Sequence, residues 1–120
     1  MRSMLLAMIA ISLLFAPVHA RDTTSEMMPG CRDYIAVGKG TSRPERADIV
    51  STTECVTTIH TILLLEQLLV PTLRFCRPDG VTGNDAIELV VRDLGTPPKF
   101  GDKPFFIVVI ATFQKHWPCR

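Results

Sequence analysis

The sequence predicts an all-α fold: one small four-helix domain with two disulfides, following a cleaved signal peptide. Three observations lead to this prediction. The chain has 120 residues, of which 47% are hydrophobic, so it has room for a single packed domain. Apolar residues recur at steps of three and four along most of its length, which is the helical period. All four cysteines follow the N-terminal apolar run, and an even number of cysteines in a small exported chain indicates disulfides.

The first twenty residues have the pattern of a secretory signal peptide. Arg2 provides a short positive start, residues 4–16 form an apolar run, and small side chains precede a cut after Ala20. The run is shorter than the roughly 20 apolar residues that cross a bilayer. We therefore expect cleavage after Ala20, a single domain over residues 21–120, a periplasmic location, and no membrane association after cleavage.

The first half of the expected domain contains two predicted helices. Residues 21–30 suit a frayed end or a first short helix, which Asp22 or Thr23 could cap. Turn-forming residues gather over residues 38–44 and predict a loop. Residues 45–70 repeat apolar positions at steps of three and four over a length far beyond that of a strand. This spacing predicts one long helix, which should end or bend at Val70, before Pro71.

Two further helices are predicted in the second half. Thr82 and Asp85 form a relative of the capping box, and Gly95 follows the last apolar residue of that helix. We expect Asp102 to cap the fourth helix, with Pro104 in its first turn. Residues 105–112 would also suit a buried strand, but length and the cap favour a helix. The core face predicted for this helix consists of Phe106, Val109, Ile110, Phe113 and Trp117.

The spacing of the cysteines favours disulfides over a metal site. Zinc ligands usually come in close pairs, whereas Cys31, Cys55, Cys76 and Cys119 are widely separated. Sequence alone allows three pairings. If the third and fourth helices form an antiparallel hairpin, the start of one lies beside the end of the other, which brings Cys76 to Cys119. By the same reasoning, Cys31 fastens the first helix to Cys55 in the second.

No residue pattern indicates catalysis. The formal net charge is +1, so the chain lacks the basic surplus that nucleic-acid binding needs. Neither His60 nor His116 lies in a catalytic motif, and we expect export to oxidise all four thiols. We therefore expect a protein that is not an enzyme, with no catalytic residue, no cofactor and no metal. Function should instead depend on binding another protein.

The connection before the fourth helix is the best candidate for that contact. Pro97, Pro98 and Pro104 restrict its backbone, which lowers the entropy cost of binding. An aromatic side chain among charged ones is a common interface anchor. An ordinary turn in which the ring packs into the core is the alternative. The candidate partner-binding residues are Lys99, Phe100, Asp102 and Lys103.

Three segments of the second half resemble one protein family. Residues 75–82, Phe-Cys-Arg-Pro-Asp-Gly-Val-Thr, resemble the Cys-x-Pro-x-Gly-Val-Thr signature of the exported Rap/Tai-type immunity proteins. Residues 89–94 resemble the family's Val-Val-x-x-Tyr-Leu helix, and Trp117-Pro118-Cys119 resembles its end. Where the family tends to have Pro-Glu, this chain has Pro98-Lys99-Phe100. The similarity covers residues 55–119.

The resemblance implies a function as well as a fold. It implies an all-helical periplasmic domain, often a homodimer, that protects bacteria against a peptidoglycan amidase effector injected by type VI secretion. Such a protein binds the amidase and blocks its active-site cleft. The alternative is a small disulfide-bonded helical periplasmic chaperone, or a stress-related binding protein without a cognate toxin. A neighbouring gene for an amidase would favour immunity, whereas acid-triggered monomerisation with client binding would favour the chaperone.

Overall fold

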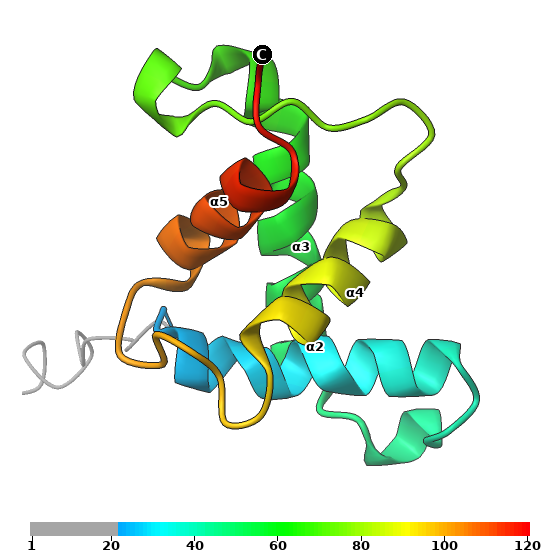
Figure 1. Cartoon of the computed structure of the whole chain (residues 1–120). Coiled ribbons are helices and arrows are strands. Elements are labelled where there is room, and N and C mark those ends of the chain that lie inside the picture. Colours follow the sequence, from blue (N-terminus) through cyan, green and yellow to red (C-terminus); the bar gives the residue numbers. More distant parts are fainter. Residues whose placement is uncertain (1–21) are drawn as a thin grey trace, which may run out of the picture.

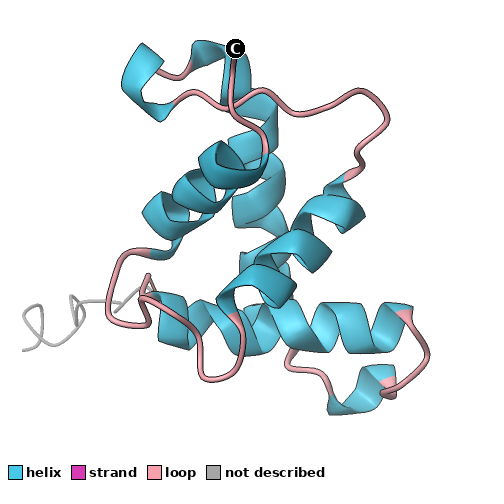
Figure 2. Cartoon of the chain, in the orientation of Figure 1, coloured by secondary structure: helices cyan, strands magenta, loops and turns pink. Residues whose placement is uncertain are grey.

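The computed structural model describes residues 22–120 as an all-α domain (Figure 1). Its helices are α2 (Thr24–Gly38), α3 (Ile49–Leu65), α4 (Gly83–Leu94) and α5 (Phe105–His116), with 3₁₀ turns at Pro44–Arg46, Glu66–Leu68 and Pro71–Leu73. Figure 2 shows helices and loops but no strand in this part of the chain, so the predicted fold class is confirmed. The signal peptide predicted over residues 1–20 lies outside the described residues.

Helix α2 is longer than the short helix predicted over residues 21–30. Thr23 caps it in a capping box: its hydroxyl accepts from the Glu26 amide, and the Glu26 carboxylate accepts from the Thr23 amide. The helix continues through Pro29 to Gly38. Met27, Met28 and Cys31 are buried in the core, and this packing stabilises turns that weak local propensity did not predict.

Helix α3 is shorter than the helix predicted over residues 45–70. Asp48 has an extended backbone and its carboxylate accepts a hydrogen bond from the Val50 amide at 3.1 Å, so the helix begins after it. Beyond Leu65 the chain tightens into a 3₁₀ turn. Leu64 and Leu68 continue the apolar spacing but are about four-fifths exposed. Apolar spacing without core packing therefore misplaced the end of this helix.

Helices α2 and α3 approach closely at one disulfide. Cys31 and Cys55 are bonded, with their Cα atoms 5.4 Å apart, and both side chains are fully buried. Beside them, Gly30 faces the backbone of Ser51 so closely that a Cβ atom at residue 30 would collide with the Ser51 carbonyl group. Gly30 therefore permits the contact between these two helices.

Helix α4 begins and ends as predicted, whereas α5 does not begin at its predicted cap. The Thr82–Asp85 capping box and the Gly95 C-cap of α4 are both present. The prediction that Asp102 caps α5 is wrong: Pro104 occupies the N-cap position, and no side chain caps the helix. The reason is tertiary, because the first amide of α5, that of Phe105, donates to the carbonyl of Asp22 at 2.7 Å.

The core face of α5 also differs by one residue from the prediction. Phe105 is 2% exposed and lies in the core, whereas Phe106 is 50% exposed. Val109, Ile110 and Phe113 are buried as predicted. The helix starts with a continuous apolar run, and such a run does not reveal which of its residues faces inward.

The second disulfide, Cys76–Cys119, is present, but the ends of α4 and α5 are not aligned as in the simple hairpin used to predict it. Asp93, near the end of α4, contacts Lys115 and His116 near the end of α5. In an antiparallel hairpin Asp93 would lie beside the start of α5. Both cysteine pairs are nevertheless the predicted ones.

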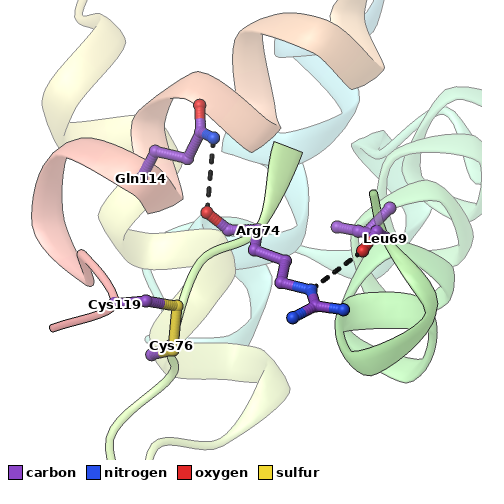
Figure 3. Close-up of a disulfide and its surroundings, with 5 residues drawn as sticks. All are labelled: Leu69, Arg74, Cys76, Gln114 and Cys119. Atoms are coloured by element: carbon purple, nitrogen blue, oxygen red, sulfur yellow. Dashed lines mark hydrogen bonds between the residues drawn. A yellow bond between two sulfur atoms is a disulfide. The ribbon is translucent and has the colours of Figure 1, made fainter. Parts of the chain in front are cut away.

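The segment before α4 forms this disulfide because it runs along the end of α5. Figure 3 shows the bond together with Gln114, which points at the Arg74 carbonyl. The side-chain amide of Gln114 donates to the backbone carbonyls of Thr72 and Arg74, and the backbone amide of Cys76 donates to the Trp117 carbonyl at 2.7 Å. These hydrogen bonds hold the two cysteines in reach of each other.

One hydrophobic core joins all four helices. Phe113 and Trp117 stack with their ring centroids 4.6 Å apart, and Phe75, next to the second disulfide in the sequence, packs against both rings at a tilt. The other members come from every helix. They are Met27, Met28, Cys31, Cys55, Ile59, Ile62, Leu63, Ala86, Ile87, Leu89, Val90, Leu94, Phe105, Val108, Val109 and Ile110.

Candidate functional site

A groove with a volume of about 580 Å³ lies between the end of α4, the loop over residues 95–104 and the outer side of α5. Both polar and apolar side chains line it, and we call it the lysine groove. The apolar lining consists of Leu94, Phe100, Pro104, Ile107, Val108 and Ala111. The polar lining consists of Asp93, Lys99, Lys103, Thr112 and Lys115.

The start of α2 holds the loop over residues 95–104 in place. The Thr24 amide and hydroxyl both donate to the Lys103 carbonyl, at 2.9 and 3.0 Å, and the Ser25 amide donates to the Gly101 carbonyl at 2.9 Å. Thr24 is fully buried. Figure 1 shows the orange part of this loop returning beside the blue start of α2. The loop is therefore anchored to a helix, which reduces its freedom in the unbound protein.

Phe100 projects from this loop in an unfavourable backbone conformation. Its φ is 58°, in the left-handed region that disfavours bulky residues, and the residue is 63% exposed. The alternative in which the ring packs into the core is therefore wrong. Neither local propensity nor core burial explains an aromatic residue here, and strained residues of this kind are often functional.

Three lysines stand around the groove, and two of them have acidic partners. Lys103 Nζ lies 3.0 Å from the Asp102 carboxylate, and Lys115 Nζ lies 2.7 Å from Asp93 Oδ1. Lys99 has no side-chain partner within residues 22–120. The lysine groove therefore has one ammonium group that is available to a binding partner without breaking an existing ion pair.

Asp93 is the only acidic residue in the lining of the groove. Its side chain is 16% exposed, and Oδ1 also lies 3.0 Å from His116 Nε2. The hydrogen bond from Lys115, followed by the contact with His116, lowers the pKa of this carboxyl below its usual value. Asp93 therefore remains ionised and holds Lys115 at the wall of the groove.

The structure brings three of the four predicted site residues to this groove. Lys99, Phe100 and Lys103 line it, whereas Asp102 does not line it and instead pairs with Lys103 from the exposed side. The sequence analysis missed the contribution of α5. Ile107, Ala111 and Lys115 recur every four residues on the side of the helix opposite the predicted core face, and this spacing was a usable signal.

Neither histidine belongs to a recognisable metal site in the described part of the chain. His116 contacts Asp93, as given above, and His60 is exposed and lines a separate hollow with Leu64 and Gly83. No cluster of three His, Cys, Asp or Glu side chains in residues 22–120 could hold a metal ion.

Two other exposed surfaces are mainly apolar. A groove of about 510 Å³ lies over α3, between Met27 and the start of that helix, and includes Ile49 and Val50. The second surface, which we call the leucine patch, begins in the last turn of α3 and continues beyond its end. It consists of Leu64, Leu65, Leu68 and Val70.

Comparisons with protein-family models, with curated proteins and with solved structures found no match to this chain. One feature nevertheless bears on where it works. Both disulfides indicate an oxidising, extracytoplasmic environment. No helix within residues 22–120 is long and apolar enough to cross a membrane.

Proposed function

We propose that the mature chain is a periplasmic immunity protein that binds a type VI secreted peptidoglycan amidase and blocks its active-site cleft. The observation that carries the proposal is Phe100, an exposed aromatic residue in a strained conformation between Lys99 and Lys103. Aromatic residues beside cations are typical interface anchors. The proposal includes export by the signal peptide with cleavage after Ala20.

The rigidity of the supporting loop favours blocking by occupation of a cleft. Thr24 and Ser25 anchor the loop to α2, and Pro97, Pro98 and Pro104 restrict its backbone. A loop that is already ordered loses little entropy when it binds, so more of the contact energy remains as affinity. Occupation of a cleft requires no chemistry from the inhibitor, in keeping with the expectation that the chain is not an enzyme.

The resemblance to Rap/Tai-type proteins supports the same proposal. It implies an all-helical domain, and the residues that carry it include Cys76 and Cys119, which form a disulfide here. The family tends to have Pro-Glu where this chain has Pro98-Lys99-Phe100. Because these residues lie at the lysine groove, we expect the amidase recognised by this chain to differ from those of its relatives at the matching surface.

The test is affinity capture of periplasmic and effector proteins on the purified mature chain. We expect capture of a peptidoglycan amidase. Lys99→Ala combined with Phe100→Ala should weaken that complex at least tenfold, or about 1.4 kcal/mol, without lowering stability. The matched control is Arg43→Ala combined with Leu68→Ala, which removes an exposed cation and an exposed apolar side chain outside the groove. Capture without an amidase, or equal effects of the two double variants, would contradict the proposal.

The leucine patch favours a second candidate, a disulfide-bonded periplasmic chaperone. Leu64 is 82% exposed and Leu68 is 80% exposed, and exposed apolar surface is what a chaperone offers to unfolded clients. A second copy of the chain could cover the same patch, so the proposal includes a possible homodimer. Sedimentation at neutral and acid pH, with a client aggregation assay, separates the candidates. Acid-triggered monomerisation together with protection of the client would favour the chaperone.

A further inference from the structure

The lysine groove carries a positive charge. Its lining contains three lysines and one carboxylate, and Asp93 is already engaged by Lys115 and His116. Lys99 has no acidic partner within the described residues, and Lys103 pairs only with an exposed neighbour, an interaction that typically contributes less than about 1 kcal/mol. A carboxylate that binds in this groove can therefore pair with an ammonium group without breaking a strong ion pair.

The floor of the groove is apolar and partly exposed to water. Leu94, Pro104 and Ala111 line it, and Ile107 is 40% exposed in the unbound protein. Burial of this surface and of the ring of Phe100 by an apolar partner would be favourable, because each square ångström removed from water contributes about 25 cal/mol. The groove therefore combines an apolar floor with a cationic edge.

We propose that the lysine groove binds a peptide segment that alternates apolar and acidic residues. An apolar side chain of the segment packs between Phe100 and Ile107, and its neighbouring carboxylate pairs with Lys99. A fatty acid also combines an apolar chain with a carboxylate. Its single chain could cover the α5 side of the groove but would leave the Phe100 side in water, whereas a peptide covers both sides. The inference rests on the proposed function, because we expect this segment to be part of the amidase.

The experiment uses the isotope-labelled mature chain and three synthetic probes: a short peptide of alternating leucine and glutamate, its counterpart with lysine in place of glutamate, and decanoate. We expect the leucine–glutamate peptide to shift amide resonances within residues 93–115 and to bind at least tenfold more tightly than the leucine–lysine peptide. Equal binding of the two peptides, shifts centred on the leucine patch, tighter binding of decanoate, or no binding of any probe would overturn the inference.

Two charge-reversal variants sharpen the result. Lys99→Glu should lower the affinity for the leucine–glutamate peptide at least tenfold. Arg43→Glu changes the net charge equally but lies in the loop at the opposite end of α2, so it should leave the affinity unchanged (Figure 1). If both variants lower the affinity equally, the preference for the leucine–glutamate peptide depends only on the net charge of the protein, and the inference is overturned.

The outcome is distinguishable from that of the proposed function. If the peptide does not bind but an amidase is still captured and inhibited, the inference fails and the immunity function stands. If the peptide binds but no amidase is captured, the groove recognises acidic and apolar segments of some other protein, and the immunity function fails.

Discussion

Phe100 is the only non-glycine residue within residues 22–120 that has a positive φ, and this gives it an unusual mutational signature. Alanine and glycine both remove the ring, but only glycine adopts the left-handed conformation without strain. We predict that Phe100→Gly is more stable than Phe100→Ala by about 1 kcal/mol in urea unfolding. Both variants should bind the amidase equally poorly.

The matched pair of variants is Phe106→Gly and Phe106→Ala, since Phe106 is also exposed but lies on a helix. There the order should reverse, with alanine more stable by about 1 kcal/mol. If alanine is the more stable replacement at both positions, Phe100 is not strained, and the argument for its functional role loses its basis.

Asp93 predicts a pH dependence of stability. Its pKa is lowered in the folded protein by Lys115 and then by His116, so the ionised form stabilises the fold. This contribution is complete above the ordinary carboxyl pKa and is lost as the pH falls through the lowered folded value. We predict that Asp93→Asn lowers the free energy of unfolding by about 1 kcal/mol at neutral pH, and that this loss shrinks as the pH falls below the ordinary carboxyl pKa. An equal loss at neutral and at acid pH would show that the ionised carboxylate of Asp93 does not contribute.

At the scale of elements, the sequence predicted which segments are helical better than where they begin and end. The capping box at Thr82 and the stop at Gly95 depend on neighbouring residues, so local reading located α4 correctly. Helix α5 begins at Phe105 because that amide meets the carbonyl of Asp22, a contact between distant parts of the chain. Local signals at Asp102 could not reveal it.

In the candidate site, too, some features could be predicted from local sequence and others depend on contacts between distant residues. Three of its residues, Lys99, Phe100 and Lys103, were predicted from the composition and stiffness of the loop. The wall that α5 contributes was missed, although the spacing of Ile107, Ala111 and Lys115 opposite the predicted core face was a usable signal for it. The anchoring of Lys103 by Thr24 joins residues far apart in the sequence and leaves no local signal.

The anchor between α2 and the loop gives a prediction for Thr24. Thr24→Val keeps the shape of the buried side chain but removes the hydroxyl that donates to the Lys103 carbonyl. We expect the free energy of unfolding to fall by about 1 kcal/mol. Hydrogen exchange should accelerate over residues 99–105, and affinity for the amidase should drop.

The control for this variant is Thr41→Val in the loop that follows α2, which removes an exposed hydrogen bond of the same length, 3.0 Å, to the Ala36 carbonyl. It should leave exchange over residues 99–105 unchanged. Unaltered exchange in Thr24→Val as well would mean that the loop is ordered without its helix anchor.

The contact between α2 and α3 gives a prediction for Gly30. A Cβ atom there collides with the backbone of Ser51, so Gly30→Ala must push the two helices apart. We expect a loss of about 2 to 3 kcal/mol in urea unfolding. Gly38→Ala, at a helical position with open space around it, should be neutral or slightly stabilising. Similar stabilities of the two variants would show that the helices have room to adjust.

At the scale of the whole molecule, one disulfide stabilises the first half of the domain and the other stabilises the second half. Cys31–Cys55 joins α2 to α3 across a sequence separation of 24, and Cys76–Cys119 fastens the end of the chain to the segment before α4 across a separation of 43. Loop-closure entropy gives contributions of about 3.5 and 4 kcal/mol, which are large for a domain of this size. The lysine groove is therefore built on a covalently reinforced scaffold.

The most direct test of the proposed function is the rate of peptidoglycan hydrolysis by the captured amidase as the mature chain is added. We predict that hydrolysis stops at one equivalent of the parent protein. It should continue in the presence of one equivalent of the Lys99→Ala, Phe100→Ala double variant. If the amidase remains active in a stable complex with the parent protein, or if the double variant inhibits as well as the parent, the lysine groove does not block the enzyme.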